Sequence, residues 1–136
     1  MKDCIFCKII NKEIPSCIVY ESKEVIAFLD ISPINKGHTL VMPKKHYETF
    51  LDLPKSELEV LFGKIQEVTK AVIKATNADG FNLLLNNKRA AGQVVDHVHF
   101  HVIPRFENDG LKHWPHGKYN EGEDEKIATK IRSFLK

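Results

Sequence analysis

Imidazole and apolar side chains alternate strictly over the run His97-Val98-His99-Phe100-His101, which has valines and an isoleucine on its two sides. In an extended strand, side chains two positions apart lie on the same face. The pattern therefore predicts a strand over 94–103, with three histidines on one face and apolar residues directed into a core on the other. Three adjacent imidazoles contribute little to packing, whereas they suit metal binding or phosphoryl chemistry near neutral pH. The run therefore indicates a functional strand.

Length and charge restrict the class of protein. The chain has 136 residues, which suit one domain with a hydrophobic core, and its net charge is +2 from 20 basic and 18 acidic residues. This balance argues against nucleic acid or a membrane as the main partner. No apolar stretch reaches membrane-spanning length and the first residues do not form a signal peptide, so we expect a cytoplasmic protein.

The order of elements predicts an α+β fold. The expected strands cover 17–20, 24–29, 38–42, 81–85 and 94–103. Residues 54–76 carry apolar side chains at steps of three and four, which predicts one long amphipathic helix against the core. The stretch 111–122 is expected to be irregular and 123–135 to form a closing helix. Too few strand–helix–strand units are present for a doubly wound parallel sheet.

Three cysteines suggest a metal rather than a disulfide framework. Cys4 and Cys7 form a C-x2-C pair, and two thiolates at this spacing suit tetrahedral zinc. A redox dithiol is disfavoured, because such a pair sits at a helix start after a strand and nothing strand-like precedes Cys4. Cys17 precedes an apolar run and is expected to be a small buried residue.

Spacing alone leaves the other two zinc ligands open. The candidates are the seven histidines His38, His46, His97, His99, His101, His113 and His116. The separation of His113 and His116 favours them as a second pair, yet one histidine of the 97–101 run is equally permitted.

The same run also suits nucleophilic catalysis. A neutral imidazole nitrogen attacks phosphorus well when the other ring nitrogen holds the proton against a fixed acceptor. The polar loop before the run contains Gly92, Gln93 and Val94, whose amides could face a phosphate, although a plain tight turn explains this loop equally well. A third possibility is that all three alternating histidines bind one metal, which predicts a metallohydrolase or a metal-dependent barrel.

Residues 92–105 resemble the signature of the histidine-triad (HIT) family, His-φ-His-φ-His-φ-φ, in which φ is apolar. Three earlier segments, 3–15, 27–33 and 37–46, are similar to the Hint branch of this family and occur in the right order. The resemblance covers about 3–106 and leaves out the C-terminal tail. It implies a single HIT domain over 1–136, with a helical tail from about 107.

The resemblance implies a fold and a reaction. Family members are α+β domains with an antiparallel sheet, one long helix and a C-terminal helix, and two copies pair as a two-fold homodimer that joins their sheets. They bind purine ribonucleotides and cleave the bond between the α-phosphate and its substituent. Nucleoside phosphoramidates, dinucleoside polyphosphates and related AMP conjugates are the implied substrates.

The resemblance also implies catalytic roles. His99, the middle histidine, would attack the α-phosphate and form a nucleotidyl-histidine intermediate that water resolves. His101 would contact the phosphate and assist the leaving group, while His38 would support this cluster from a neighbouring strand. Asp30 would accept hydrogen bonds from the ribose hydroxyls, which predicts a preference for ribonucleotides.

The remaining implied contacts divide into two groups. The phosphate would be held by Asn86, Gly92, Gln93 and Val94, and the base slot would consist of Phe6, Ile9, Phe28 and Ile31. Family members often carry a hydroxyl residue at the place of Val94, so here only the backbone amide can contribute. An apolar slot recognises ring faces better than exocyclic groups, which predicts weak discrimination between adenine and guanine.

For zinc, the resemblance selects one ligand set from the open alternatives. Some members bind structural zinc through a C-x2-C pair and two histidines, which here are Cys4, Cys7, His46 and His97. Such a closed site would link the N-terminus to the histidine run without activating water. Many relatives lack the cysteines, so catalysis is not expected to need the ion.

Two other functions remain open from the sequence. One is a nucleotide-binding or partner-binding module with vestigial catalysis, and the other is the metalloenzyme described above. In the unmatched tail, His113 and His116 are expected on the surface. Trp114 is expected to reach either the active site or a dimer partner.

Overall fold

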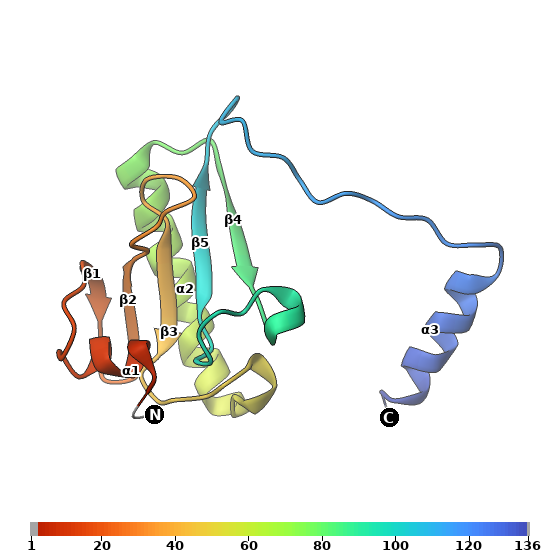
Figure 1. Ribbon diagram of the computed structural model, residues 1–136, viewed down its shortest axis with the longest axis horizontal. Helices are drawn as coiled ribbons and strands as arrows, with labels where there is room; N and C mark the ends of the chain where they lie inside the picture. The colour runs from red at the N-terminus through yellow and green to blue at the C-terminus, as the bar shows by residue number, and fades with distance from the viewer. Residues whose placement is uncertain (1–2, 136) are drawn as a thin grey trace.

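One antiparallel sheet of five strands forms the centre of the molecule, in the order β1-β2-β3-β5-β4, as the computed structural model in Figure 1 shows for residues 3–135. The strands are β1 (Ile18–Glu21), β2 (Val25–Leu29), β3 (Thr39–Pro43), β4 (Gly80–Leu85) and β5 (Phe100–Arg105). The helices are α1 (Ile5–Ile10), α2 (Lys55–Thr76) and α3 (Glu123–Ser133), with short 3-10 turns η1 (Phe50–Asp52) and η2 (Arg89–Ala91). The predicted α+β class with one long helix and a closing helix is confirmed.

Helix α2 covers one face of the sheet. Its predicted stripe is confirmed, because Leu61, Ile65 and Val68 are buried in one cluster with Phe100 of β5 and Val98 just before that strand. Burying such side chains contributes about 1.5–3 kcal/mol each. This face of the sheet is therefore filled by core packing.

The N-terminal segment covers the other face. Phe6 and Ile9 of α1 are buried against Phe28 of β2 and Met42 of β3. The sequence analysis did not predict α1, because six residues are too few to show a helical period. Its first turn is capped by Cys4, whose sulfur accepts the Cys7 N–H at 3.4 Å.

The boundaries predicted for the histidine strand are wrong at its start. β5 begins only at Phe100, opposite Val41 of β3, and the chain before it bends. The bend is fixed by hydrogen bonds outside any ladder, such as the Val98 N–H to the Tyr47 carbonyl at 2.7 Å. The alternation still holds through the bend, because Val98, Phe100 and Val102 enter the α2 core.

The prediction of a buried Cys17 is also wrong. Cys17 is exposed, because it precedes β1, the strand at the edge of the sheet, where no neighbouring strand covers it.

A C-terminal arm, residues 107–122, leaves the end of β5 and carries α3 away from the rest of the chain, beyond β4 (Figure 1). Its course is irregular, as predicted, and none of the residues of α3 is buried. Within residues 3–135, no helix combines the length and apolar character that crossing a membrane requires.

Candidate active site and metal centre

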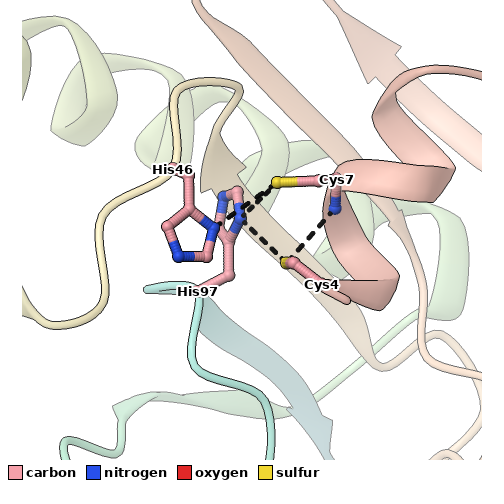
Figure 2. Close-up of side chains that lie close together, drawn as sticks. All are labelled: Cys4, Cys7, His46 and His97. Carbon is pink, nitrogen blue, oxygen red and sulfur yellow. Dashed lines mark hydrogen bonds between the residues drawn. The ribbon is translucent and has the colours of Figure 1, made fainter. Parts of the chain in front are cut away.

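Four sulfur and nitrogen ligand atoms converge where α1 meets the bend before β5. Figure 2 shows Cys4 and Cys7 facing the rings of His46 and His97. The Nδ1 atom of His97 lies 3.5 Å from the Cys4 sulfur and 3.6 Å from the Cys7 sulfur, and the Nδ1 atom of His46 lies 3.4 Å from the Cys7 sulfur. All four candidate ligand atoms lie within 4.8 Å of one another.

These separations fit a tetrahedral zinc ion. Bonds of about 2.3 Å to sulfur and about 2.05 Å to nitrogen place the two ligand atoms about 3.6 Å apart at the tetrahedral angle. The Nε2 atom of His97 lies 2.8 Å from the carbonyl oxygen of Pro43, which can only accept a hydrogen bond. The proton of the neutral ring is therefore on Nε2, and the lone pair of Nδ1 is directed at the cysteines.

Protonation in this cluster is set by burial. His97 is fully buried, and burial lowers its pKa to about 4, so the ring is neutral at pH 7. Burial and the neighbouring Cys4 raise the pKa of Cys7 to about 11. Metal binding at this cluster must therefore release thiol protons, whereas the histidine is already in its ligating form.

His99 lies beside this cluster with a defined tautomer. Its Nδ1 atom is 2.7 Å from the carbonyl oxygen of His97, so Nδ1 carries the proton and donates it. The ring is buried, and this burial lowers the pKa of His99. Its other nitrogen, Nε2, consequently holds a free lone pair at neutral pH. This is the protonation state that a nucleophilic imidazole needs.

Two consecutive hydrogen bonds connect the backbone of Ile34 to His38 and His38 to His101. The Ile34 N–H donates to Nδ1 of His38 at 3.1 Å, so a neutral His38 carries its proton on Nε2. That Nε2 lies 2.9 Å from Nδ1 of His101 and donates to it. The proton of His101 is therefore on Nε2, where it can be donated to a bound group. The rings of His99 and His101 lie 4.9 Å apart between centroids.

Burial keeps both histidines of this pair neutral. It lowers the pKa of His101 to about 4, with further lowering by His99 and His38. It also lowers the pKa of His38, against the opposing effect of Asp30, whose carboxylate lies 3.6 Å from Nε2 of His38. Asp30, His38 and His101 also form a possible metal cluster by proximity. The proton on Nε2 of His38 makes that nitrogen a donor, which disfavours a metal there.

The turn around Gly92 lies in the loop before these histidines. Gly92 has a φ of 91°, a left-handed conformation that glycine adopts without strain. Its N–H donates to the Arg89 carbonyl at 3.0 Å, and the N–H of Gln93 donates to the Lys88 carbonyl at 3.1 Å. Of the three amides predicted to face a phosphate, the Val94 N–H is the one without such a partner within residues 3–135, so a ligand can use it.

The side chain of Gln93 is an internal brace of this turn. It is buried, its carbonyl accepts the Lys88 N–H at 2.7 Å, and its amide donates to the Glu48 carbonyl at 2.6 Å. Arg89 adds hydrogen bonds from its guanidinium to the carbonyls of Gln93 and Val94. These contacts fix where the exposed Val94 lies. No sequence motif signalled this bracing role.

The residues expected at the base slot differ in exposure. Phe6, Ile9 and Phe28 are buried together on the histidine face, and the ring of Phe6 lies 4.9 Å from that of His99. Ile31 is 97% exposed. The side chain of Asn86 lies next to Gly92. A Cβ atom built on Gly92 would be 3.7 Å from the side-chain amide nitrogen of Asn86, Nδ2.

The arm places its residues away from both clusters. His113, Trp114 and His116 are exposed, as expected for the two histidines, and His113 and His116 do not join the cysteines. The pairing that spacing favoured is thus wrong, because the segment that carries it leaves the body. The hydrogen bonds from Pro43 and Ile34, which set the tautomers, come from distant backbone groups and leave no signal in the sequence.

Comparisons with known proteins show which family this chain is similar to. The HIT domain family matches residues 11–108. An uncharacterised HIT-like protein of Methanocaldococcus jannaschii is 60% identical over 107 residues, which are 79% of this chain and 82% of that protein. The adenylylsulfatase HINT3 of Arabidopsis thaliana is 46% identical over 80% of this chain and 55% of its own length. The adenosine 5'-monophosphoramidase hnt1 of Schizosaccharomyces pombe is 39% identical over 98% of both chains.

Solved structures extend the similarity to three dimensions. A crystal structure of a HIT family protein from Bacillus subtilis has a TM-score of 0.91 and 38% identity, and covers 98% of both chains. A Streptococcus mutans protein has a TM-score of 0.93 and 41% identity, over 100% of this chain and 87% of its own. A Zn-bound histidine triad protein from Mycobacterium smegmatis has a TM-score of 0.77 and 31% identity over 97% of both chains. The first two superpositions include the arm and α3.

Proposed function

This chain belongs to the HIT domain family, and on that premise we propose that it hydrolyses purine ribonucleotide derivatives at the α-phosphate through a nucleotidyl intermediate on His99. The observation that carries the proposal is the hydrogen bond from Nδ1 of His99 to the carbonyl of His97. It leaves a buried, neutral Nε2 with a free lone pair. Relatives named adenosine 5'-monophosphoramidase and adenylylsulfatase support the same substrate class.

The first chemical step forms a phosphorus–nitrogen bond. The lone pair of Nε2 of His99 attacks the α-phosphorus, and the bond to the leaving group breaks with its electron pair. The imidazole then carries positive charge, which the carbonyl of His97 stabilises through the Nδ1–H bond. His101 donates its Nε2–H toward the departing atom, where negative charge develops. Its orientation is held by His38, which donates to its Nδ1 at 2.9 Å.

The second step releases the nucleotide. Water attacks the same phosphorus and passes one proton to Nε2 of His101, which replaces the proton that His101 gave to the leaving group. The bond from phosphorus to Nε2 of His99 breaks, and His99 recovers its lone pair while the nucleoside monophosphate departs. Because His99 is the leaving group in this step, a neutral ring after departure is favourable. The lowered pKa of His99, caused by burial, serves both steps.

Substrate recognition is proposed for the groups around these histidines. Asp30 would accept the ribose hydroxyls, since its carboxylate lies at the end of β2 and one oxygen is already fixed by the Ser32 N–H at 2.8 Å. The Val94 amide would donate to a phosphate oxygen, with Asn86 beside Gly92 as a side-chain donor. The base would lie against the apolar group Phe6, Ile9, Phe28 and Ile31.

We propose a structural zinc ion at Cys4, Cys7, His46 and His97. The tetrahedral fit of the sulfur–nitrogen distances supports it, and so does the Zn-bound relative from Mycobacterium smegmatis. Four protein ligands leave no open position, so the ion would supply cross-linking and not activation of water. The ligand His97 also presents the carbonyl that orients His99, so the metal centre supports the nucleophile indirectly.

The active unit is proposed to be a homodimer joined at β4. This strand lies at the edge of the sheet and pairs only with β5 among the described strands. Phe81 and Leu83 on β4 are 46% and 42% exposed, and Phe62 on α2 is 42% exposed. An unpaired edge with apolar side chains is suited to pairing with a second copy.

The test is direct capture of the intermediate. Purified protein is mixed with adenosine 5'-phosphoramidate or a diadenosine polyphosphate, quenched at intervals, and examined by mass spectrometry for AMP on His99. We expect the adduct in the wild type and in His113→Ala, an exposed control, and none in His99→Ala. Steady turnover by His99→Ala would contradict the mechanism. AMP binding without release of product by the wild type would instead indicate a binding module.

A further inference from the structure

A polar cluster that the proposed reaction does not use lies at the end of the sheet where β5 finishes and the arm begins. We call it the Asp109 cluster, and it consists of Asn35, Asn82, Arg105 and Asp109. Asn35 belongs to the β2–β3 loop, residues 30–38, whereas Asn82 is on β4 and Arg105 ends β5. Figure 1 shows this loop and the start of the arm at the same end of the sheet. The cluster therefore joins segments that are far apart in the sequence.

The carboxylate of Asp109 is the centre of this cluster. Its side chain is only 8% exposed, and it accepts hydrogen bonds from Nε and Nη2 of Arg105 at 2.8 and 3.0 Å. The N–H groups of Phe106 and Leu111 also donate to it, each at 3.1 Å. The hydrogen bonds, with those from Arg105 foremost, hold the pKa of Asp109 well below its usual range. The group is therefore an anion at neutral pH, and its donors fix it from several sides.

Asn35 connects this fixed acceptor to the active site. Its side-chain nitrogen, Nδ2, donates to the Asp109 carboxylate at 3.1 Å and to the Pro104 carbonyl at 2.9 Å, which uses both protons of the amide. The backbone carbonyl of Asn35 accepts the His38 N–H at 3.0 Å. Both the side chain and the backbone of Asn35 are therefore held, and the adjacent peptide units are restricted with them.

The residue before Asn35 determines which nitrogen of His38 carries the proton. The Ile34 N–H donates to Nδ1 of His38 at 3.1 Å, so the proton is on Nε2 and is donated to Nδ1 of His101 at 2.9 Å. If the Ile34 N–H turned away, His38 could carry its proton on Nδ1, and its Nε2 would then accept a hydrogen bond from Nδ1 of His101. Nε2 of His101 would then hold a lone pair. In that tautomer His101 has no proton to give to a leaving group.

Asp30 favours the same tautomer of His38, but more weakly. Its carboxylate lies 3.6 Å from Nε2 of His38, which is too far for a hydrogen bond. In the proposed function, the same carboxylate also accepts the ribose hydroxyls. The direct contact from the Ile34 N–H is therefore the main determinant of the tautomer.

We propose that Asn35 is a positioning residue for the proton donor His101. Its fixed side chain holds the Ile34 N–H on Nδ1 of His38, and this contact selects the tautomer in which His101 can donate. The inference rests on the function proposed above and deepens it, because it concerns the step in which the leaving group takes a proton. The effect of Asn35 should therefore depend on how strongly the leaving group needs that proton.

Two substrates with different leaving groups test this role. Adenosine 5'-phosphoramidate releases ammonia, whose nitrogen must take a proton, whereas the para-nitrophenyl ester of AMP releases a phenolate that is stable without one. For both, kcat/KM reports the steps up to release of the leaving group. We expect Asn35→Ala to raise the ratio of kcat/KM for the ester to kcat/KM for the phosphoramidate about tenfold. A loop displaced as a whole would weaken binding of both substrates equally, so a ratio within about twofold of the wild-type value would overturn the proposal.

Asn82→Ala is the matched control. Asn82 accepts a hydrogen bond from Nη1 of Arg105 at 2.7 Å, so its loss weakens the same cluster without changing a residue of the β2–β3 loop. Its ratio should equal that of the wild type, and an equal rise in Asn82→Ala and Asn35→Ala would overturn the assignment. Asp109→Asn is a second variant in case Asn35→Ala does not fold. It removes one acceptor of Asn35 and leaves Pro104, so the ratio should rise by a smaller factor, and an unchanged ratio would also contradict the proposal.

The tautomers can also be observed by nuclear magnetic resonance of nitrogen-labelled protein, because the ring nitrogen shifts show which nitrogen carries the proton. We expect the proton on Nε2 of His38 and His101 in the wild type and in Asn82→Ala, and on Nδ1 in part of the Asn35→Ala molecules. An identical tautomer in all three proteins would overturn the proposal. The adduct on His99 separates the possible failures. Its absence from the wild type with both substrates refutes the proposed function and this inference, whereas its presence with an unchanged ratio refutes the inference alone.

Discussion

Replacing Gln93 with leucine tests how the turn before the active site is held in place. The buried side chain of Gln93 accepts the Lys88 N–H at 2.7 Å and donates to the Glu48 carbonyl at 2.6 Å. Leucine has a similar volume and makes neither hydrogen bond. Gln93→Leu therefore removes both contacts without opening a large cavity.

The expected cost follows from the two backbone groups left behind. A buried donor or acceptor that loses its partner costs about 1–3 kcal/mol. Lys88 and Glu48 are themselves exposed residues, so water can reach their backbone groups in part, and the lower end of that range applies to each. We expect Gln93→Leu to lower the free energy of unfolding by about 2 kcal/mol.

The assay is urea unfolding of the zinc-loaded protein, monitored by circular dichroism. Gln66→Leu is the matched control, because Gln66 lies exposed on α2 and the same substitution there should change stability by less than about 0.5 kcal/mol. Gln93→Leu should also raise KM for the phosphoramidate more than it lowers kcat, since the turn places the Val94 amide. Equal stabilities for the two variants would refute the bracing role.

Three further predictions address protonation, backbone strain and the metal. Burial lowers the pKa of His101 from its ordinary 6.5 to about 4, so the unfolded chain takes up a proton at this position before the folded chain does as the pH falls. About 3 kcal/mol of stability is therefore lost between pH 6.5 and 4. Thermal melts across this range should show a melting temperature that depends less on pH for His101→Asn than for the wild type. Gly37→Ala should lower the free energy of unfolding by about 2 kcal/mol, because φ at Gly37 is 100° and the new Cβ atom would meet Thr76. Gly63→Ala in α2 should raise the free energy of unfolding by about 0.5–1 kcal/mol, since alanine favours a helix more than glycine does. Urea unfolding of both variants measures these changes. Cys7→Ser should abolish stoichiometric zinc in elemental analysis and lower the melting temperature, while the adduct on His99 still forms; full zinc retention would contradict the assigned ligands.

Much of the fold could be predicted because its elements have strong periodic signals. The long helix 54–76 shows its stripe over six turns, and the alternation at Val98, Phe100 and Val102 places the core face of β5. α1 was missed because it is shorter than two turns. The start of β5 was placed too early, since the valines at 94 and 95 favour a strand by composition while tertiary hydrogen bonds bend the chain there.

The candidate site was less predictable than the fold. Cys4 and Cys7 identify themselves by spacing, yet spacing alone favoured His113 and His116 as their partners. Those histidines lie in the arm, whereas His46 and His97 meet the cysteines only through the packing of α1 against the sheet. Contacts between residues about 90 positions apart depend on topology, so no local pattern could select them.

His97 connects the proposed metal centre with the proposed nucleophile. Its Nδ1 atom faces the two cysteines, its Nε2–H donates to the Pro43 carbonyl, and its own carbonyl accepts from Nδ1 of His99. Each contact restricts the same peptide unit, so a shift of the ring would also turn the carbonyl that fixes the tautomer of His99. The roles proposed for neighbours two residues apart therefore differ: His97 would ligate the metal and orient His99, His99 would attack, and His101 would donate a proton. A single metal shared by all three would need the lone pair of Nε2 on His99, which is the atom that the proposed reaction uses.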